Sequence, residues 1–161
     1  MLVKRGQPLD TETFWYLDAV EEALCFGWID SVHKAIPNFG HAQKLSPRKK
    51  KSPWSELNKE RCRRLKKLGL MTNSGEAVLP DMNTSNFVID TDILQLLKED
   101  PELSRKFHGF PQLYQRIRID AIQREKKKPA VYARMKENFI KNTKQNKMYG
   151  LWNDYGRLLD Y

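Results

Sequence analysis

The pattern of apolar residues changes at Gly27, and this change constrains the fold more than any other feature of the sequence. Ahead of Gly27, apolar residues recur at the spacing of one helix face: Phe14, Leu17, Val20 and Leu24. After it, residues 28–36 and 41–46 favour two strands joined by a turn. Glycine is the residue type that most readily takes the left-handed conformation at a helix end. The sequence therefore predicts a helix over residues 11–26, followed by an antiparallel β-hairpin.

A two-stranded hairpin is only marginally stable in water, so helices must cover one of its faces. Residues 52–68 supply a second helix, because Ser52 is a good cap and Pro53 suits the first helical position. We therefore expect an α+β fold, in which a small antiparallel sheet of two or three strands is packed by the helices of residues 11–26 and 52–68.

The rest of the chain is expected to be mostly helical. Pro101, Pro111 and Pro129 each stand at the start of a helical apolar pattern, which is where a helix tolerates proline. A shorter helix, capped by Asp90 or Thr91, precedes them.

These patterns predict three parts. The first is an α+β core over residues 1–75, the second an acidic connector with a short helix over residues 76–104. The third is a helical region over residues 105–161 that packs on the core. Its last fourteen residues are rich in aromatic and aliphatic side chains, and their spacing predicts a short docked helix.

Four ordered segments carry residues typical of one known family. They are Tyr16 with residues 19–30, then Ser46-Pro47-Arg48, then Ser52 with Trp54-Ser55 and Asn58, and last Met71-Thr72 with Gly75. In this order they resemble the signature of the YdeI/OmpD-associated family, also called bacteriocin-protection proteins. The resemblance implies a context of bacteriocin tolerance or envelope stress and brings no reaction with it. Of that family's C-terminal pair of arginines, only the second has a counterpart here, at Arg134.

Composition narrows the class of protein. No stretch is long and apolar enough to cross a membrane, so membrane insertion is not expected. The first residues lack the apolar centre of a signal peptide, which favours a cytoplasmic location. Cys25 and Cys62 are too few for a disulfide scaffold, and each is expected as a small buried apolar residue.

Positive charge is concentrated in two blocks of a chain whose net charge is +9. Residues 44–67 carry a net charge of +9 and residues 105–147 of +10, with −6 in between over residues 68–104. Such blocks form either a solvated face or a surface for a polyanion. The candidate polyanion-binding residues of the first block are Arg48, Lys49, Lys50, Lys51, Arg63, Arg64, Lys66 and Lys67. The second block adds Arg116, Arg118, Arg124, Lys126, Lys127, Lys128 and Arg134.

A polyanion partner of these blocks is expected to be bound without sequence preference. No helix-turn-helix, zinc-finger or RNP signature accompanies the charge, so nonspecific contact with nucleic acid or another polyanion is the matching hypothesis.

The resembling segments also bring together a candidate site for a small anionic ligand. Its residues are Trp28, Asp30, Arg48, Ser52, Trp54 and Ser55. In one interpretation they are structural, with Asp30 accepting hydrogen bonds from Arg48 or from backbone N–H groups. In the other, Arg48 and the helix start after Ser52 hold a phosphate or carboxylate.

Enzyme chemistry has little support in the sequence. His33, His41 and His108 lack metal-ligand spacing, so neither a metal nor a cofactor is expected. Cys25 and Asp30 lie close to His33 along the chain, which keeps an enzyme with Cys25 or Asp30 as its reactive group as one hypothesis. The leading hypothesis is a non-enzymatic binding protein whose basic surface meets an anionic partner. A domain that binds a small phosphate- or carboxylate-bearing ligand is the alternative.

Overall fold

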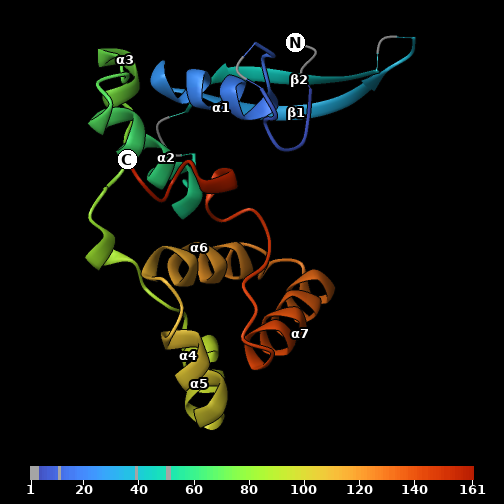
Figure 1. Cartoon of the computed structure of the whole chain (residues 1–161), viewed down its shortest axis with the longest axis vertical. Coiled ribbons are helices and arrows are strands. Elements are labelled where there is room, and N and C mark those ends of the chain that lie inside the picture. The colour runs from blue at the N-terminus through green and yellow to red at the C-terminus, as the bar shows by residue number, and fades with distance from the viewer. Residues whose placement is uncertain (1–3, 11, 39, 50–51) are drawn as a thin grey trace. The chain divides into compact units, whose positions relative to one another are not determined.

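The computed structural model describes residues 4–10, 12–38, 40–49 and 52–161, and it divides into two units (Figure 1). The first unit comprises Met1–Trp54, Asn58–Met82 and Asp154–Tyr161. The second comprises Ser55–Leu57 and Asn83–Asn153. The boundaries differ from the predicted ones, because the helix of the acidic connector shares its core with the helices that follow it, and the last eight residues return to the first unit.

The β-hairpin of the first unit confirms the predicted α+β fold. Helix α1 (Tyr16–Cys25) leads into strand β1 (Trp28–Ile36), which pairs antiparallel with β2 (Gly40–Pro47). Gly27 separates α1 from β1 and has a φ of 74°, as a helix-ending residue should. In Figure 1 the hairpin continues past the end of α1, and residues 31–36 are all exposed. A single helix thus covers only the part of the hairpin near Trp28.

Helix α1 begins five residues later than predicted. The carboxylate of Asp18 accepts a hydrogen bond from the backbone N–H of Trp15 at 2.8 Å, so it caps the helix from inside its first turn. Asp10 instead accepts the N–H of Thr13 at 2.6 Å in a separate turn ahead of the helix. Phe14, predicted on the buried face, is therefore outside the helix and half exposed. Asp10, Thr11 and Thr13 are all residue types suited to cap a helix start, and of these Thr11 lies outside the described residues.

Helix α2 (Glu56–Lys67) also begins later than predicted, so the assignment of Ser52 as its cap is wrong. Ser52 donates its backbone N–H to Lys49 in a turn, and the Pro53 carbonyl accepts a hydrogen bond from the Arg48 side chain at 3.2 Å. These bonds hold the segment before Glu56 in a non-helical conformation. The hydrophobic core of the first unit contains Val20, Leu24, Cys25, Cys62 and Leu65.

Helix α3 (Asn73–Glu76) packs closely on the end of α1. Thr72 donates both its backbone N–H (3.0 Å) and its hydroxyl (2.6 Å) to the carbonyl of Cys25. A Cβ at Gly75 would overlap that carbonyl, so only glycine fits at this contact.

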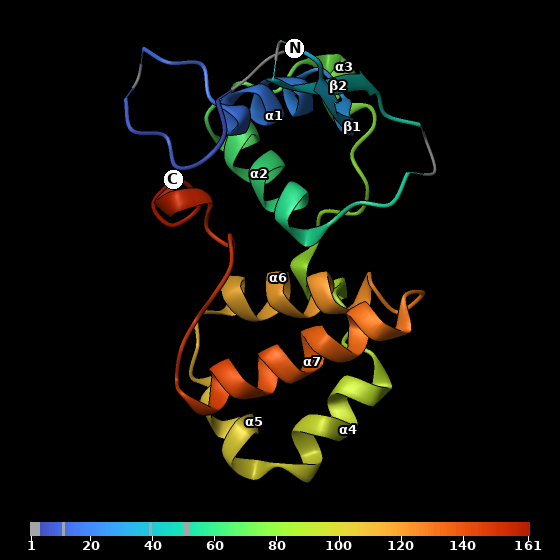
Figure 2. The ribbon, with the colours of Figure 1, turned by 90° about the vertical axis from the view of Figure 1, so that its right-hand side faces the viewer.

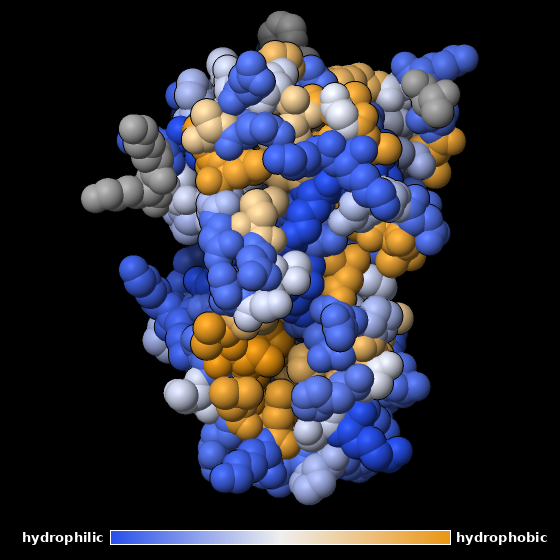
Figure 3. Space-filling view, turned by 90° about the vertical axis from the view of Figure 1, so that its left-hand side faces the viewer, coloured by the Kyte–Doolittle hydropathy of each residue, from blue (hydrophilic) through white to orange (hydrophobic). Residues whose placement is uncertain are grey.

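The second unit is helical, as predicted for the C-terminal portion. It holds a 3₁₀ turn η1 (Thr84–Asn86), then α4 (Thr91–Glu99), α5 (Pro101–His108), α6 (Gln112–Gln123) and α7 (Pro129–Lys144). Figure 2 shows α7 running between α6 and the α4–α5 pair. Their shared core includes Ile93, Leu103, Phe107, Tyr114, Ile122 and Phe139. Figure 3 shows further apolar side chains gathered on one outer face of this unit.

The C-terminal segment forms a single 3₁₀ turn, η2 (Asp154–Gly156), where the sequence predicted a short docked helix. Asp154 and Tyr155 both have positive φ values, which a right-handed helix does not permit. The prediction that apolar residues of this segment dock is confirmed at Trp152 and Leu158, which are buried.

Candidate functional site

The six residues of the predicted small-ligand site are divided between different places. Trp28 lines an apolar groove beside α1, whereas Ser55 lines a pocket in the second unit. Asp30 accepts a hydrogen bond from the hydroxyl of Tyr16 and not from Arg48. Trp28 and Asp30 belong to the first unit and Ser55 to the second, so a ligand site formed by all six residues stays a prediction.

The side chain of Arg48 is engaged in contacts within the first unit. Its guanidinium stacks on Trp54 with 3.6 Å between its carbon and the ring centre, and it donates to the Pro53 carbonyl. The residue is buried, and its stacked guanidinium holds Arg48 against Trp54 and the Pro53 carbonyl. Ser52 takes part in the turn of that same segment.

The first basic block is largely engaged within the first unit. Arg64 pairs with Glu21 at 2.8 Å, Lys66 with Glu76 at 3.1 Å, and Lys67 donates to the carbonyl of Tyr161. Arg63 donates to the carbonyl of Met82 and pairs with Glu60. Lys49 is exposed, and the other two lysines of the predicted run, Lys50 and Lys51, lie outside the described residues.

The thiol of Cys25 does not have the environment of a nucleophile. Cys25 is buried, and burial raises the pKa of its thiol, which keeps it protonated and unreactive at neutral pH. Cys62 is also buried, and its pKa is raised to about 12 for the same reason. Asp30 is held by the Tyr16 hydroxyl.

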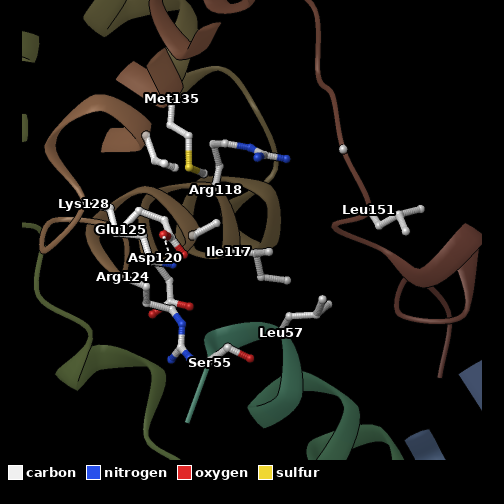
Figure 4. Close-up of a pocket in the computed structure, with 13 residues that line it drawn as sticks. Ser55, Leu57, Ile117, Arg118, Asp120, Arg124, Glu125, Lys128, Met135 and Leu151 are labelled. Carbon is white, nitrogen blue, oxygen red and sulfur yellow. Dashed lines mark hydrogen bonds and ion pairs between the residues drawn. The ribbon is translucent and has the colours of Figure 1, made fainter. Parts of the chain in front are cut away.

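A pocket of the second unit lies along α6 and α7 and has a volume of about 530 Å³ (Figure 4). Much of its wall is apolar: Leu57, Ile117, Ala121, Val131, Met135 and Leu151. Its polar groups belong to Ser55, Arg118, Asp120, Arg124, Glu125 and Lys128. A wall of this kind, with a few polar groups at its edge, is typical of a small-molecule site.

The sequence of α6 explains why this wall forms. Ile117, Ala121, Arg124 and Lys128 follow one another at spacings of four, three and four, so they share one side of the helix and the turn that extends it. Val131 and Met135 of α7 lie one turn apart and line the same pocket.

Two contacts attach the Ser55–Leu57 segment to α6. The backbone N–H of Glu56 donates to the carboxylate of Asp120 at 3.0 Å, which satisfies a free N–H at the start of α2. The carboxylate of Glu56 lies 3.0 Å from Nε of Arg116. These bonds place Leu57 in the wall of the pocket.

Positive charge dominates the polar edge of the pocket. Lys128 pairs with Glu125 at 2.8 Å, whereas Arg124 is exposed and forms no ion pair with any residue in the described ranges. Figure 4 shows the side chain of Arg124 extending toward Ser55. Arg124 can therefore reach an acidic group of a bound molecule without first losing a partner.

Arg118 contributes a buried guanidinium to the same pocket. It stacks on the ring of Tyr149 at 4.0 Å and donates from Nη2 to the carbonyl of Tyr149. Its Nε is buried, and no described residue accepts a hydrogen bond from it. An unsatisfied buried N–H of this kind costs about 1–3 kcal/mol, so a ligand oxygen or a water at this place would stabilise the site.

Sequence reasoning named Arg118, Arg124 and Lys128 as members of a basic block but did not predict the pocket they line. The apolar half of the wall carries no motif. The available signal was the shared helix side from Ile117 to Lys128, which combines apolar residues with arginine and lysine.

Two further features bear on function. Across the described ranges, no helix combines the length and apolar character that a bilayer crossing requires. The described part of the chain also contains no group of three or more His, Cys, Asp or Glu side chains arranged to hold a metal ion.

Comparison with known proteins gives one match. Residues 1–78 match a family described as a domain of unknown function (DUF8412), which covers 78 of the 161 residues. No curated protein and no solved structure matches the chain. The matched region takes in α1, the hairpin, α2 and α3, and it does not include α6 and α7. The resemblance to the YdeI/OmpD-associated family, the link to bacteriocin tolerance and the cytoplasmic location stay predictions.

Proposed function

We propose that this protein is a binding protein whose ligand is a small molecule with an anionic group attached to an apolar body. The observation that carries the proposal is the pocket along α6 and α7. It joins an apolar wall to the guanidinium of Arg124, which pairs with no carboxylate among the described residues. This is the small-ligand hypothesis from the sequence, moved from the segment around Arg48 to the second unit.

The apolar wall of the pocket is the reason for proposing a ligand with an apolar body. Its volume of about 530 Å³ lies within the range of small-molecule sites, roughly 300–1,000 Å³. Ile117 is buried, whereas Leu151 at the other side is exposed. A ligand that covers Leu151 removes its apolar surface from water, which favours binding.

The two arginines of the pocket, Arg118 and Arg124, are the reason for proposing an anionic group on the ligand. Arg124 presents a planar fork of N–H donors that suits a carboxylate, phosphate or sulfonate. Arg118 adds a buried Nε without a described acceptor. Asp120 and Glu125 bring two carboxylates to the same pocket, and the three cations Arg118, Arg124 and Lys128 outnumber them.

A pair of fluorescent dyes tests the proposal. Anilinonaphthalene sulfonate has an apolar ring system and one negative charge, and phenylnaphthylamine has the same rings without the charge. We expect both to bind, because the wall is apolar. Arg124→Ala should weaken the sulfonate dye by about threefold to fivefold and leave the neutral dye unchanged, since only one dye can pair with the guanidinium.

Two control variants complete the experiment. Leu151→Ala removes apolar wall and should weaken both dyes, while Arg134→Ala removes an exposed cation of α7 that is not part of the pocket. The proposal is contradicted if Arg134→Ala weakens the sulfonate dye as much as Arg124→Ala does, or if neither dye binds saturably.

Exposed cations of the second unit support a second candidate, nonspecific polyanion binding. Lys127, Arg134 and Lys141 are exposed and form no ion pair with any described residue. A polyanion surface would give nucleic acid affinity that falls steeply with salt. An anisotropy titration with short DNA and RNA tests this, with Arg134→Ala and Lys141→Ala expected to weaken binding. Absence of binding at low salt would exclude it.

A further inference from the structure

We infer that the first unit has a docking groove for a basic, amphipathic segment of another protein. The groove runs along α1 and the start of the hairpin, and its volume is about 320 Å³. It is lined by Phe14, Ala19, Glu22, Ala23, Phe26, Trp28 and Leu45. It shares no residue with the pocket along α6 and α7 and is independent of the proposed function.

Three exposed aromatic side chains line the groove. Phe14 is 52% exposed, Phe26 49% and Trp28 41%, and all three line this one hollow. A group of large exposed apolar side chains on a protein surface often marks an interaction site. Aromatic side chains in particular supply the central contacts of protein interfaces.

The shape of the groove favours side chains of a helical segment. Ala19 and Ala23 lie one turn apart on α1 and are buried, so the floor is formed by small residues. Larger aromatic rings stand around this floor. A hollow lined by small and aromatic apolar residues suits the apolar face of a partner helix, as in helix-in-groove recognition.

Charge decides which segment fits. Between Gly6 and His33 the sequence has six carboxylates and no lysine or arginine, although the whole chain has a net charge of +9. Asp18 and Glu21 are neutralised by Arg157, with ion pairs of 2.7 and 2.8 Å. Asp30 accepts the Tyr16 hydroxyl.

Asp10 accepts the backbone N–H groups of Glu12 and Thr13, so two carboxylates of this stretch are left for a partner. Glu22 lines the groove, and Glu12 lines a second hollow that shares Phe14 with it. Both are exposed, and neither forms an ion pair with any residue that the structure describes. An apolar groove with acidic edges is complementary to a segment that places lysine or arginine next to its apolar anchors.

Binding of a designed peptide tests this inference. The probe is a fluorescein-labelled helical peptide of about 15 residues, with leucine at positions i, i+3, i+4 and i+7 and lysine elsewhere. Its counterpart has glutamate in place of every lysine. We expect the lysine peptide to bind saturably and the glutamate peptide to bind at least about tenfold more weakly.

Variants assign the binding to the groove. Trp28→Ala should weaken the lysine peptide by about tenfold or more, because it removes an aromatic contact. Glu22→Lys should weaken it by about fivefold through its charge. Both residues are exposed, so both variants are expected to fold, and their unfolding curves check this. Glu137→Gln, an exposed carboxylate of α7, is the matched control and should bind as the unchanged protein does.

Three results would overturn the inference. The first is equal affinity for the lysine and glutamate peptides. The second is unchanged affinity in both Trp28→Ala and Glu22→Lys. The third is a dimer of the unchanged protein, seen by sedimentation, that Trp28→Ala dissociates, since the groove would then hold a second copy of the chain.

Discussion

Nε of Arg61 donates to Oδ2 of Asp154 at 2.6 Å, and Nη2 of the same arginine donates to Oδ1 at 2.8 Å. This two-bond ion pair joins the middle of α2 to the C-terminal segment of the first unit. Both side chains are largely withdrawn from water, with exposed fractions of 13% and 3%. Arg157 adds bonds to Asp18 and Glu21 of α1. The last residues of the chain therefore stabilise a unit formed mostly by the first ones.

Asp154→Asn should destabilise the first unit by about 3 kcal/mol, because it leaves the buried guanidinium of Arg61 without its counter-charge. Asparagine keeps the shape of aspartate and tolerates the positive φ of 48° at this position. Urea unfolding measures the change. Asp160→Asn, the same substitution at an exposed site nearby, is the control and should change stability by less than about 0.5 kcal/mol. Equal effects of the two variants would contradict the structural role of Asp154.

Gly150→Ala should destabilise the protein more than Gly69→Ala does. The two glycines have similar φ values, 77° and 71°, so the conformational penalty for alanine is about 1 kcal/mol at each. A Cβ at Gly150 would also overlap the guanidinium of Arg118, whereas Gly69 has open space. Thermal unfolding should show at least about 1 kcal/mol of additional loss for Gly150→Ala. Similar losses at both positions would mean that Arg118 does not lie against Gly150.

The Gly150 variant also bears on the pocket. Moving Arg118 displaces a guanidinium that lines the pocket, so Gly150→Ala should weaken the anionic dye, and Gly69→Ala should not.

Tyr16 should make stability depend on pH in alkaline solution. Burial, and then the hydrogen bond to Asp30, raises the pKa of Tyr16 from 10.0 to about 12. The folded state thus favours the neutral phenol. The stabilisation that the neutral Tyr16 phenol gives the folded state is fully present below pH 10 and is lost as the pH rises toward about 12. Tyr16→Phe cannot ionise, so its stability should fall less steeply between these pH values, as alkaline urea titrations can measure. An equal slope in both proteins would contradict the raised pKa.

The two cysteines should be unreactive in the folded protein. Both thiols are buried, and burial raises both pKa values. A colorimetric thiol reagent at neutral pH should modify neither in buffer and both in denaturant. Rapid modification of Cys25 in the folded state would support the hypothesis of an enzyme that uses this thiol.

The sequence was sufficient to predict those helices and strands whose positions depend on a local pattern of residues. The hairpin after Gly27 and the helices beginning at Pro101 and Pro129 were predicted from residue spacing, glycine and proline. The starts of α1 and α2 were not, because a local cap that was not recognised sets the first and a tertiary bond sets the second. Asp18 caps α1 from its third residue, and Asp120 accepts the N–H of Glu56 from a distant part of the chain.

The candidate site was the harder prediction. The motif residues around Arg48 proved to be engaged in stacking and turns, and basic residues of the first block in ion pairs. The pocket along α6 and α7 combines side chains from four separate segments, and only the folded chain brings Leu57, Val131 and Leu151 to the same side of α6. No local spacing encodes such a convergence.

Backbone amide NMR spectra recorded during a titration with anilinonaphthalene sulfonate locate the bound dye, and so they test directly whether the pocket along α6 and α7 binds an anion. We expect the largest shifts at residues along the pocket, such as Ala121, Arg124 and Val131, and we expect these shifts to saturate together. Shifts confined to the groove around Trp28, or small shifts spread over the surface without saturation, would contradict an anion-binding pocket along α6 and α7.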